Sequence, residues 1–275
     1  MARNFNGTSD KIVVARAPEL DTELANAMTV ACWFRRVGAQ ASYAALISKT
    51  VNYGAASPYV QYVFQFNSTS DTAVRVVFAD YSTQYVAGPG AMNAGDGVWH
   101  FIAGTYAKSG NAKFYYGAAT DPLLTEVVGA ATGANDLKTD TDDPLSIGAA
   151  HDNREAGEYF RYFTGDIANV GLWPYAMTPA ELEIVRAKTN PIRSKYYAPL
   201  FGTADPEPDW SGANNHGALT GTTRADHPPR IDAVWPRPRR FFSVTEAPGG
   251  VNTREKRMSA VGMLLPWMPP GVDPD

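Results

Sequence analysis

Two different periodicities meet within residues 163–187, FTGDIANVGLWPYAMTPAELEIVRA, and this stretch constrains the fold more than any other. From residue 166 to residue 173, apolar side chains alternate with a period of about two, which predicts a β-strand that buries one face. Ile167 and Trp173 share one face of this strand, and Leu172 lies on the other. Pro174 then ends the strand because it has no backbone N–H to donate.

A short capped helix is predicted directly after this strand. Thr178 is the N-cap, Pro179 takes the first helical position, and Glu181 completes a capping box. Leu182 and Val185 fall on one side of this helix and form its buried face. The stretch therefore predicts a strand, a sharp exit and a short helix.

Most of the remaining pattern is typical of β-strands. Runs rich in β-branched and aromatic residues occupy residues 28–34, 59–66, 73–79 and 98–106. The single cysteine, Cys32, lies on the buried phase of the first run, so it is a small core residue and no internal disulfide forms. At 275 residues, 44% of them hydrophobic, the chain is long enough for one large all-β domain plus an appendage.

The stretch from residue 163 resembles the end of the core in laminin-G-like, concanavalin A-like jelly-roll domains. In that family a strand of the form G-x-I-D-E-V-R-I-Y precedes a turn and a helix. The acidic pair of that strand falls here on Ala168 and Asn169, so the resemblance does not extend to the metal ligands or charges at these positions. The matching residues are Gly165, Ile167, Val170, Leu172 and Trp173.

Further segments resemble the same family in the same order, so that the resemblance covers residues 1–187. It implies an all-β, two-sheet antiparallel jelly-roll sandwich of the concanavalin A-like type with one short helix. The segments are FNGTSDKIVV at 5–14, MTVACWF at 28–34, ALISK at 45–49, VWHFIAGTY at 98–106 and PLSIG at 144–148.

A segment after the helix resembles the opening of many laminin-G-like domains, where a first strand is followed by D-x-S-G-x-x-N-H-G-x-L. We expect a permuted order, in which residues 197–221 close the sandwich with edge strands near the N-terminal strand, and a domain that spans 1–225. The residues that carry the motif are Asp209, Ser211, Gly212, Asn215, His216, Gly217 and Leu219.

Residues 226–275 predict an extended, proline-rich assembly arm. Nine of the 20 prolines lie from Pro228 onward, which disfavours a helix or a central strand. The arm is also too apolar for a free linker, so its large side chains need a surface on the same domain or on a neighbouring subunit. These side chains are Trp235, Phe241, Phe242, Leu264, Leu265 and Trp267.

Charge and hydropathy exclude several partners. The net charge of −4 gives no global attraction to nucleic acid or to an anionic membrane. No run approaches the length of a membrane span, and residues 1–20 lack the pattern of a signal peptide. We therefore expect synthesis in a host cytoplasm and neither nucleic-acid binding nor membrane insertion.

Several aromatic and polar residues are candidates for sugar contact. Trp33 is either a sugar-stacking platform or a core residue beneath a neighbouring loop, since it points away from the buried phase of its strand. The loop after PLSIG falls at the rim of the sandwich, where binding residues tend to lie. The candidates are Trp33, Tyr81, Tyr85, His151, Asp152, Asn153 and Arg154.

An acidic segment between residues 129 and 144 offers oxygen ligands for Ca²⁺. Its spacing does not fit an EF-hand, and a solvated loop is the alternative interpretation. The candidate ligands are Asp140, Asp142 and Asp143.

No catalytic motif supports an enzyme. The β-glucanases of this fold carry E-x-D-x-E on a central strand, which this chain lacks, and retaining hydrolysis needs two closely spaced carboxyl groups. The four histidines show no zinc-site spacing, and neither G-x-S-x-G nor a glycine-rich phosphate loop occurs. We expect no enzymatic activity, and a glycoside hydrolase is the weakest of the alternatives.

A compact sandwich with one buried cysteine, an apolar arm and no signal peptide is similar to jelly-roll virion proteins of tailed bacteriophages. This resemblance implies a non-enzymatic virion structural protein, either a capsid decoration or a tail-associated protein, whose jelly roll contacts host-surface or environmental glycans. Its expected partners are sister subunits and other virion proteins. The alternative is a stand-alone carbohydrate-binding lectin module.

Overall fold

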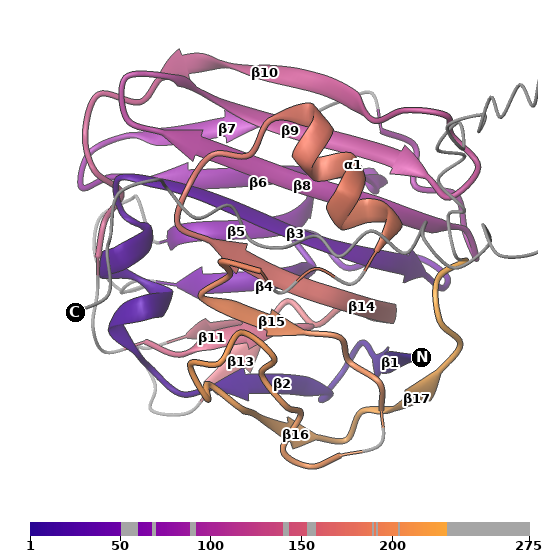
Figure 1. The fold of residues 1–275 in the computed structure, drawn as a ribbon. Helices are drawn as coiled ribbons and strands as arrows, with labels where there is room; N and C mark the ends of the chain where they lie inside the picture. Colours follow the sequence, from indigo (N-terminus) through magenta and orange to yellow (C-terminus); the bar gives the residue numbers. More distant parts are fainter. Residues whose placement is uncertain are drawn as a thin grey trace, which may run out of the picture. The chain divides into compact units, whose positions relative to one another are not determined.

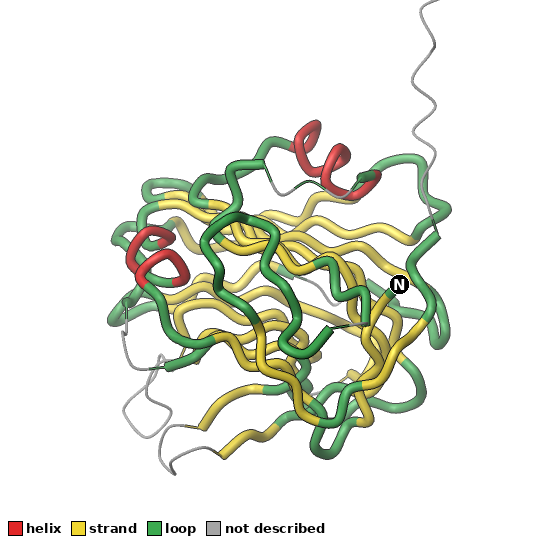
Figure 2. Tube along the Cα trace, turned by 60° about the horizontal axis from the view of Figure 1, so that its bottom comes forward, coloured by secondary structure: helices red, strands yellow, loops and turns green. Residues whose placement is uncertain are grey.

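The computed structural model describes residues 1–50, 60–67, 70–88, 92–139, 143–152, 158–188, 190, 192–202 and 204–229. In this part of the chain two antiparallel β-sheets pack face to face, and the α-helix α1 (Pro179–Ala187) lies on the outside of one sheet (Figure 1). Figure 2 shows the strands as two layers with the helices outside them. The predicted fold class, an antiparallel two-sheet sandwich with one short α-helix, is confirmed.

The first sheet, called sheet A, has the strand order β10-β9-β8-β3-β14-β1-β17, and β15 also pairs with β14. Its strands are β1 (Ala2–Asn6), β3 (Ala27–Arg36), β8 (Trp99–Ala107), β9 (Asn111–Ala118), β10 (Thr125–Thr132), β14 (Thr164–Trp173), β15 (Tyr196–Ala198) and β17 (Thr223–Ala225).

The second sheet, called sheet B, has the order β16-β2-β11-β4-β5-β6-β7, and a separate pair, β12 and β13, accompanies it. Two short 3₁₀ helices, Pro18–Leu20 and Thr22–Leu24, precede β3. The remaining strands are β2 (Lys11–Val14), β4 (Ala45–Thr50), β5 (Val60–Asn67), β6 (Ser70–Ala79), β7 (Gln84–Ala87), β11 (Leu145–Ile147), β12 (Ala150–Asp152), β13 (Glu158–Phe160) and β16 (Gly217–Thr220).

Two apolar cores hold these layers together. The larger core lies between the sheets and includes Cys32, whose burial raises the pKa of its thiol. The smaller core lies between the outer face of sheet A and α1, and it contains Trp33, Trp173 and Leu182. Sheet A is therefore buried on both faces wherever α1 covers it, which explains why the outward residues of its strands are also apolar there.

Strand β14 departs from the strict alternation expected from its sequence. The register of β14 against β3 shifts between Ala168 and Gly171, and Asn169 has a φ of 52°. This irregularity has the form of a β-bulge, which reverses the phase of the side chains that follow it. As a result Ile167 lies in the core between the sheets together with Leu172, whereas Trp173 packs under α1.

The helix begins as the sequence predicts. The Thr178 hydroxyl accepts a hydrogen bond from the Glu181 backbone N–H at 3.4 Å, and the Glu181 carboxylate accepts one from the Thr178 N–H at 2.8 Å. These reciprocal bonds satisfy backbone donors that the first turn leaves without partners. Leu182 and Val185 are buried against sheet A.

The segment after the helix adds an edge strand to each sheet. Strand β16 pairs with β2, and β17 pairs with β1, so β17 lies beside the N-terminus (Figure 1). The loop before β16 is organised by the Asp209 carboxylate, which accepts hydrogen bonds from the backbone N–H groups of Tyr197, Ser211 and Asn215. These hydrogen bonds explain the D-x-S-G-x-x-N pattern, because the Asp209 carboxylate accepts from backbone N–H groups that have no backbone partner in the loop.

The chain divides into two units, Met1–Ala233 and Val234–Asp275, and the second unit lies outside the described residues. The described part of the chain contains no helix with the length and apolar character that a membrane crossing requires.

Candidate functional site

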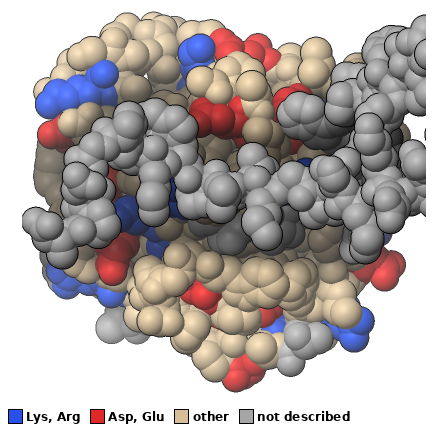
Figure 3. Space-filling model, in the orientation of Figure 1, with Lys and Arg blue, Asp and Glu red and all other residues tan. Residues whose placement is uncertain are grey.

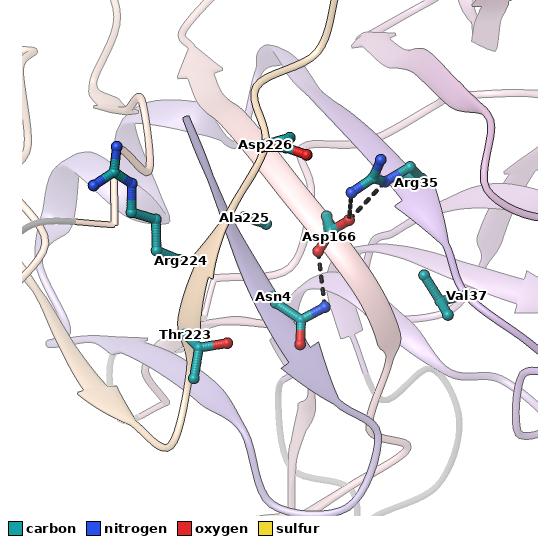
Figure 4. Close-up of a pocket in the computed structure, with 8 residues that line it drawn as sticks. All are labelled: Asn4, Arg35, Val37, Asp166, Thr223, Arg224, Ala225 and Asp226. Carbon is teal, nitrogen blue, oxygen red and sulfur yellow. Dashed lines mark hydrogen bonds and ion pairs between the residues drawn. The ribbon is translucent and has the colours of Figure 1, made fainter.

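A polar pocket of about 580 Å³ opens on the outer face of sheet A (Figure 4). It lies where β3, β14, β1 and β17 run side by side, at the end of the sheet that leads to residue 226. Its lining consists of Asn4, Arg35, Val37, Asp166, Thr223, Arg224, Ala225 and Asp226.

The strand alternation brings the central side chains of the pocket together. Their neighbours Phe5, Phe34 and Ile167 point into the core between the sheets, so Asn4, Arg35 and Asp166 point outward. In the sheet register Asp166 is directly opposite Arg35 on one side and Asn4 on the other. Such cross-strand neighbours are close enough for their side chains to interact.

The Asp166 carboxylate forms a fixed floor of the pocket. Its Oδ2 accepts a hydrogen bond from Arg35 Nε at 2.7 Å and lies 2.6 Å from Arg35 Nη2. Its Oδ1 accepts a hydrogen bond from Asn4 Nδ2 at 2.8 Å. Asp166 is 1% exposed. Arg35 is also positioned by the ring of Trp99, 5.2 Å from its guanidinium carbon. Charge-assisted bonds of this length hold both groups in one geometry before any ligand arrives.

The other wall of the pocket is exposed and comes from Thr223 and Asp226, whereas the side chain of Arg224 points away from the other lining side chains (Figure 4). The lining thus offers carboxylate, guanidinium, amide and hydroxyl groups, and Asp166 Oδ1 retains capacity for a further hydrogen bond, whereas Oδ2 is engaged by two nitrogens of Arg35. Arg35 neutralises Asp166, which leaves the exposed Asp226 carboxylate, and basic and acidic side chains are interspersed over the visible described part of this face (Figure 3). Such a lining suits a hydroxylated, uncharged ligand bound through hydrogen bonds.

Two of the aromatic candidates for sugar contact are buried, so Trp33 is the core residue of its two alternatives and Tyr85 is not accessible to a ligand. Trp33 is 1% exposed and packs edge-on against Phe101, with ring centroids 5.5 Å apart, in the core beneath α1. Tyr85 is 2% exposed and donates its hydroxyl to Asp80 at 2.5 Å. Trp33 is covered by α1 and its neighbours, and Tyr85 is covered because it lies in the core between the two sheets.

Asp80 organises the turn that contains Tyr81. Burial acts to raise the pKa of Asp80, but hydrogen bonds from Tyr85, Asn135, Ser82 and Thr83 outweigh it and hold that pKa well below its usual range. Burial and the bond to Asp80 raise the pKa of the Tyr85 hydroxyl. The network therefore stabilises a turn.

Tyr81 is the candidate that the structure leaves accessible, with 68% of its surface exposed. Its hydroxyl donates to the Thr139 carbonyl at 3.1 Å, and Lys138 lies 5.8 Å from its ring. His151 is only 9% exposed, and its Nδ1 lies 2.9 Å from Asp143 Oδ1. His151 is therefore largely covered rather than an exposed group of the rim.

The other rim residues are Asp152, whose backbone belongs to β12 but whose side chain is not described, and Asn153 and Arg154, which lie outside the described residues. The candidates whose side chains the structure describes are not brought into one site.

The expected calcium ligands are only partly visible. Asp143 is 1% exposed, and besides its contact with His151, its backbone carbonyl accepts a hydrogen bond from Lys49 Nζ. Asp140 and Asp142 lie outside the described residues, as do all the arm residues from Trp235 to Trp267. Among the residues that the structure describes, no group of three His, Cys, Asp or Glu side chains is placed to hold a metal ion.

The sequence interpretation missed the pocket residues. Arg35 and Asp166 are charged residues at outward positions of two strands, which is a weak signal on its own. The signal becomes specific only when the register places them opposite each other and adds Asn4 from β1 and Asp226 beyond β17.

The architecture and this site define a laminin-G-like jelly-roll domain with a polar surface pocket. The sequence model of one family, described as the concanavalin A-like lectin/glucanases superfamily, matches residues 6–183. The chain therefore belongs to this superfamily. No curated protein sequence matches the chain.

Solved structures show the same fold at low sequence identity. A protein of Bacteroides ovatus, whose carbohydrate binding is itself only proposed, superposes with a TM-score of 0.57 at 16% identity, over 84% of this chain and 61% of that protein. The chain thus spans less than two thirds of the length of that protein. A heptameric pentraxin of Limulus polyphemus superposes with a TM-score of 0.51 at 11% identity, over 82% of this chain and 95% of the pentraxin.

Proposed function

We propose that this protein binds glycans without catalysis and that the polar pocket on sheet A takes an uncharged sugar unit. The observation that carries the proposal is the Asp166 carboxylate, fixed by Arg35 and Asn4 at the floor of a pocket of about 580 Å³. Membership of a superfamily that includes lectins supports it, and so does the carbohydrate-binding role proposed for the Bacteroides ovatus protein.

The charges of the pocket argue for an uncharged sugar. Arg35 neutralises Asp166, and the exposed Asp226 carboxylate repels an acidic ligand while it accepts hydrogen bonds from hydroxyl groups. Sugar hydroxyls both donate and accept hydrogen bonds, and the lining supplies partners of both kinds. Binding energy is modest in such an open polar site, because each new hydrogen bond replaces one to water.

A glycan array with the full-length protein tests the proposal. Two variants alter the pocket without touching the buried ion pair: Asp226→Ala removes an exposed acceptor, and Val37→Trp fills the space from an exposed position. Asp136→Ala, at another exposed carboxylate, is the matched control. We expect both pocket variants to bind the neutral glycan of the wild type at least about tenfold more weakly. Asp226→Ala loses a polar contact in a preorganised site, and Val37→Trp occupies the space of the ligand. Unchanged binding in both would overturn the assignment.

We propose that the protein does not hydrolyse the glycan. Both Asp166 oxygens are engaged by Arg35 and Asn4, which suits a positioning carboxylate better than a proton donor. Incubation with the bound oligosaccharide should release no reducing ends. Their release, and its loss in Asp226→Ala, would contradict the proposal.

A second, compatible role is proposed from the sequence of residues 226–275. Their prolines and large apolar side chains favour an arm that joins the domain to sister subunits or to other proteins of a virion, as a capsid decoration or a tail-associated protein. Light scattering of the full chain and of a truncation after Pro229 tests it. The truncation retains Asp226, which lines the pocket. An oligomer that becomes a monomer on truncation supports the arm, and a monomer in both cases contradicts it.

A further inference from the structure

Two aromatic side chains form a partly exposed pair on the loop that joins β15 to β16 (Figure 1). The ring centroids of Phe201 and Trp210 are 5.1 Å apart, and the planes of the two rings meet at 72°. Such an edge-to-face contact covers at most one face of the indole, and 46% of the Trp210 surface is exposed. The other tryptophans of the described residues, Trp33, Trp99 and Trp173, are at most 6% exposed. The pair of Phe201 and Trp210 is called the Trp210 platform below.

The backbone of Trp210 is fixed on both sides. Its N–H donates a hydrogen bond to the Tyr197 carbonyl of β15 at 2.7 Å. The Asp209 carboxylate accepts from the Tyr197 N–H at 3.0 Å, from the Ser211 N–H at 2.9 Å and from the Ser211 hydroxyl at 2.8 Å. The residues before and after Trp210 are thus tied to each other and to β15. An indole positioned in this way loses little conformational freedom when a ligand binds.

Phe201 is held by the turn that follows β15. Leu200, with a φ of 58°, is buried in the core between the sheets, whereas Phe201 is partly exposed. A left-handed conformation at a leucine persists only where the surroundings enforce it. The Gly202 N–H donates to Glu207 Oε1 at 3.1 Å, and the same oxygen accepts from Arg3 Nε of β1 at 3.2 Å. The turn is therefore tied to sheet A on the far side of Phe201 as well.

The Trp210 platform adjoins the wall of the polar pocket. Gly202, next to Phe201, packs so closely on β17 and β1 that a Cβ atom there would lie 3.1 Å from Arg224 Cγ and 3.2 Å from the Ala2 carbonyl oxygen. Arg224 lines the pocket, and its side chain points away from the other lining side chains (Figure 4). Arg224 thus links the wall of the pocket to the turn that holds Phe201.

The chemistry around the platform favours a sugar ring over a charged partner. Residues 211–216, SGANNH, supply hydroxyl, amide and imidazole groups and contain no Asp, Glu, Lys or Arg. Asn214 and His216 of this segment are exposed. A pyranose with equatorial hydroxyl groups has C–H groups on its faces and hydroxyl groups around its rim. The C–H face fits an aromatic ring, and the rim hydroxyls fit uncharged polar side chains.

We propose that the Trp210 platform is a second glycan subsite, which stacks on the apolar face of a β-linked glucose unit. The identification of the ligand as a glycan rests on the function proposed above, whereas the platform rests on the geometry of the two rings. The pocket binds hydroxyl groups through polar side chains, and the platform binds the C–H face that polar side chains leave without a partner.

Calorimetry of the full-length protein with cellotetraose tests the subsite. All ring substituents of this neutral probe are equatorial apart from its free reducing end, so both faces of its glucose units carry C–H groups. We expect the wild type to bind it and Trp210→Ala to bind it about tenfold more weakly, because the variant loses the stacking contact. Absence of binding to the wild type would overturn the proposal.

Further substitutions separate stacking from apolar contact. Trp210→Leu keeps an apolar side chain without an aromatic face and should bind cellotetraose nearly as weakly as Trp210→Ala, whereas Trp210→Phe should recover part of the affinity. The matched control is Leu123→Ala, which removes a side chain with 70% of its surface exposed from the loop between β9 and β10, at the opposite edge of sheet A. Wild-type affinity in Trp210→Leu would contradict stacking.

Saturation-transfer NMR adds a readout that a change in folding does not imitate. With the aromatic protons of the protein irradiated, the wild type should transfer magnetisation to the axial C–H protons of cellotetraose. The transfer should fall in Trp210→Leu and persist in Leu123→Ala. The loop should remain folded in these variants, because Trp210 joins its hydrogen-bond network through the backbone N–H. Undiminished transfer in Trp210→Leu would place the ligand elsewhere.

The subsite and the pocket fail separately. Weaker cellotetraose binding in Trp210→Ala, with unchanged binding in Asp226→Ala and Val37→Trp, would support the platform and contradict the pocket. The reverse result would overturn the platform and leave the pocket untouched. Weaker binding in all three variants would support one glycan on both surfaces, and unchanged binding in all three would overturn both.

Discussion

The outer faces of the two sheets use arginine in opposite ways. On sheet A, Arg35 is neutralised by the buried Asp166 carboxylate, whose Oδ2 accepts from Arg35 Nε at 2.7 Å. On sheet B, Arg75 and Arg161 lie against the ring of Tyr43, and Arg75 donates to the amide oxygen of Gln65. A guanidinium can thus be positioned by a carboxylate on one face and by an aromatic ring on the other.

The largest expected difference is in the free energy of unfolding and concerns one aromatic residue near the outer face of each sheet. Trp33 is fully enclosed beneath α1, so Trp33→Ala should lower the free energy of unfolding by about 3–5 kcal/mol. Tyr43 is partly exposed, and Tyr43→Ala should cost about 1–2 kcal/mol, mostly through lost cation–π contacts. Urea unfolding measures both values. Equal losses would show that the two faces are equally buried.

The next largest difference between the two faces is expected in the stability lost when a charged residue is removed. Asp166→Ala leaves Arg35 without its carboxylate in a partly buried place, and we expect a loss of about 2–3 kcal/mol in the free energy of unfolding. Arg75→Ala, on sheet B, should cost no more than about 1 kcal/mol, because Arg75 contacts a ring and an amide rather than a carboxylate in these interactions. The same unfolding series decides this, and a larger loss for Arg75→Ala would reverse the comparison.

A third difference concerns the pH dependence of stability and involves Asp80, a structural carboxylate outside the candidate pocket. The pKa of Asp80 in the folded state is held below its unfolded value near 3.9, so its contribution to stability is present above that pH and is lost as the pH falls through the folded pKa. Asp80→Asn should cost about 1–2 kcal/mol at pH 7 and much less below pH 3. Thermal melting between pH 7 and pH 2.5 measures this. A constant difference between wild type and variant across that range would contradict the assignment.

The smallest effect expected is the salt dependence of binding. Affinity of the pocket for a neutral glycan should stay constant between 0.05 and 0.5 M salt, because the ligand carries no charge that salt could screen. Titrations at several salt concentrations measure this. A salt-sensitive pocket would indicate that its own charges attract the ligand.

Much of the fold could be predicted from local patterns. The capping box of Thr178 and Glu181 is present with both of its hydrogen bonds, because a cap depends only on residues three positions apart. The strands of the sandwich follow the apolar alternation of the sequence for the same reason, since which face a side chain takes is set by its immediate neighbours. The family resemblance then supplied the way in which the strands are arranged.

The site could not be predicted in this way. One irregular residue, Asn169 with its positive φ, reverses the phase of β14 and sends Trp173 to the face under α1. Trp33, which the sequence leaves open between a sugar platform and a core residue, is covered by a helix, and Tyr85, a candidate for sugar contact, is buried in the core between the sheets. Burial of an outward side chain depends on elements far away in the sequence, which no local pattern reports.

The sequence by itself determined the capped helix and the motif around Asp209, because each follows from contacts between residues close along the chain, and it determined the class of fold through the family resemblance. Only the tertiary structure decided which charged side chains meet which partners. It placed Arg35 opposite Asp166 across 131 positions of sequence and brought Arg75 and Arg161 to one ring. Strand register and sheet order set these meetings, and both are properties of the whole sandwich rather than of any one strand.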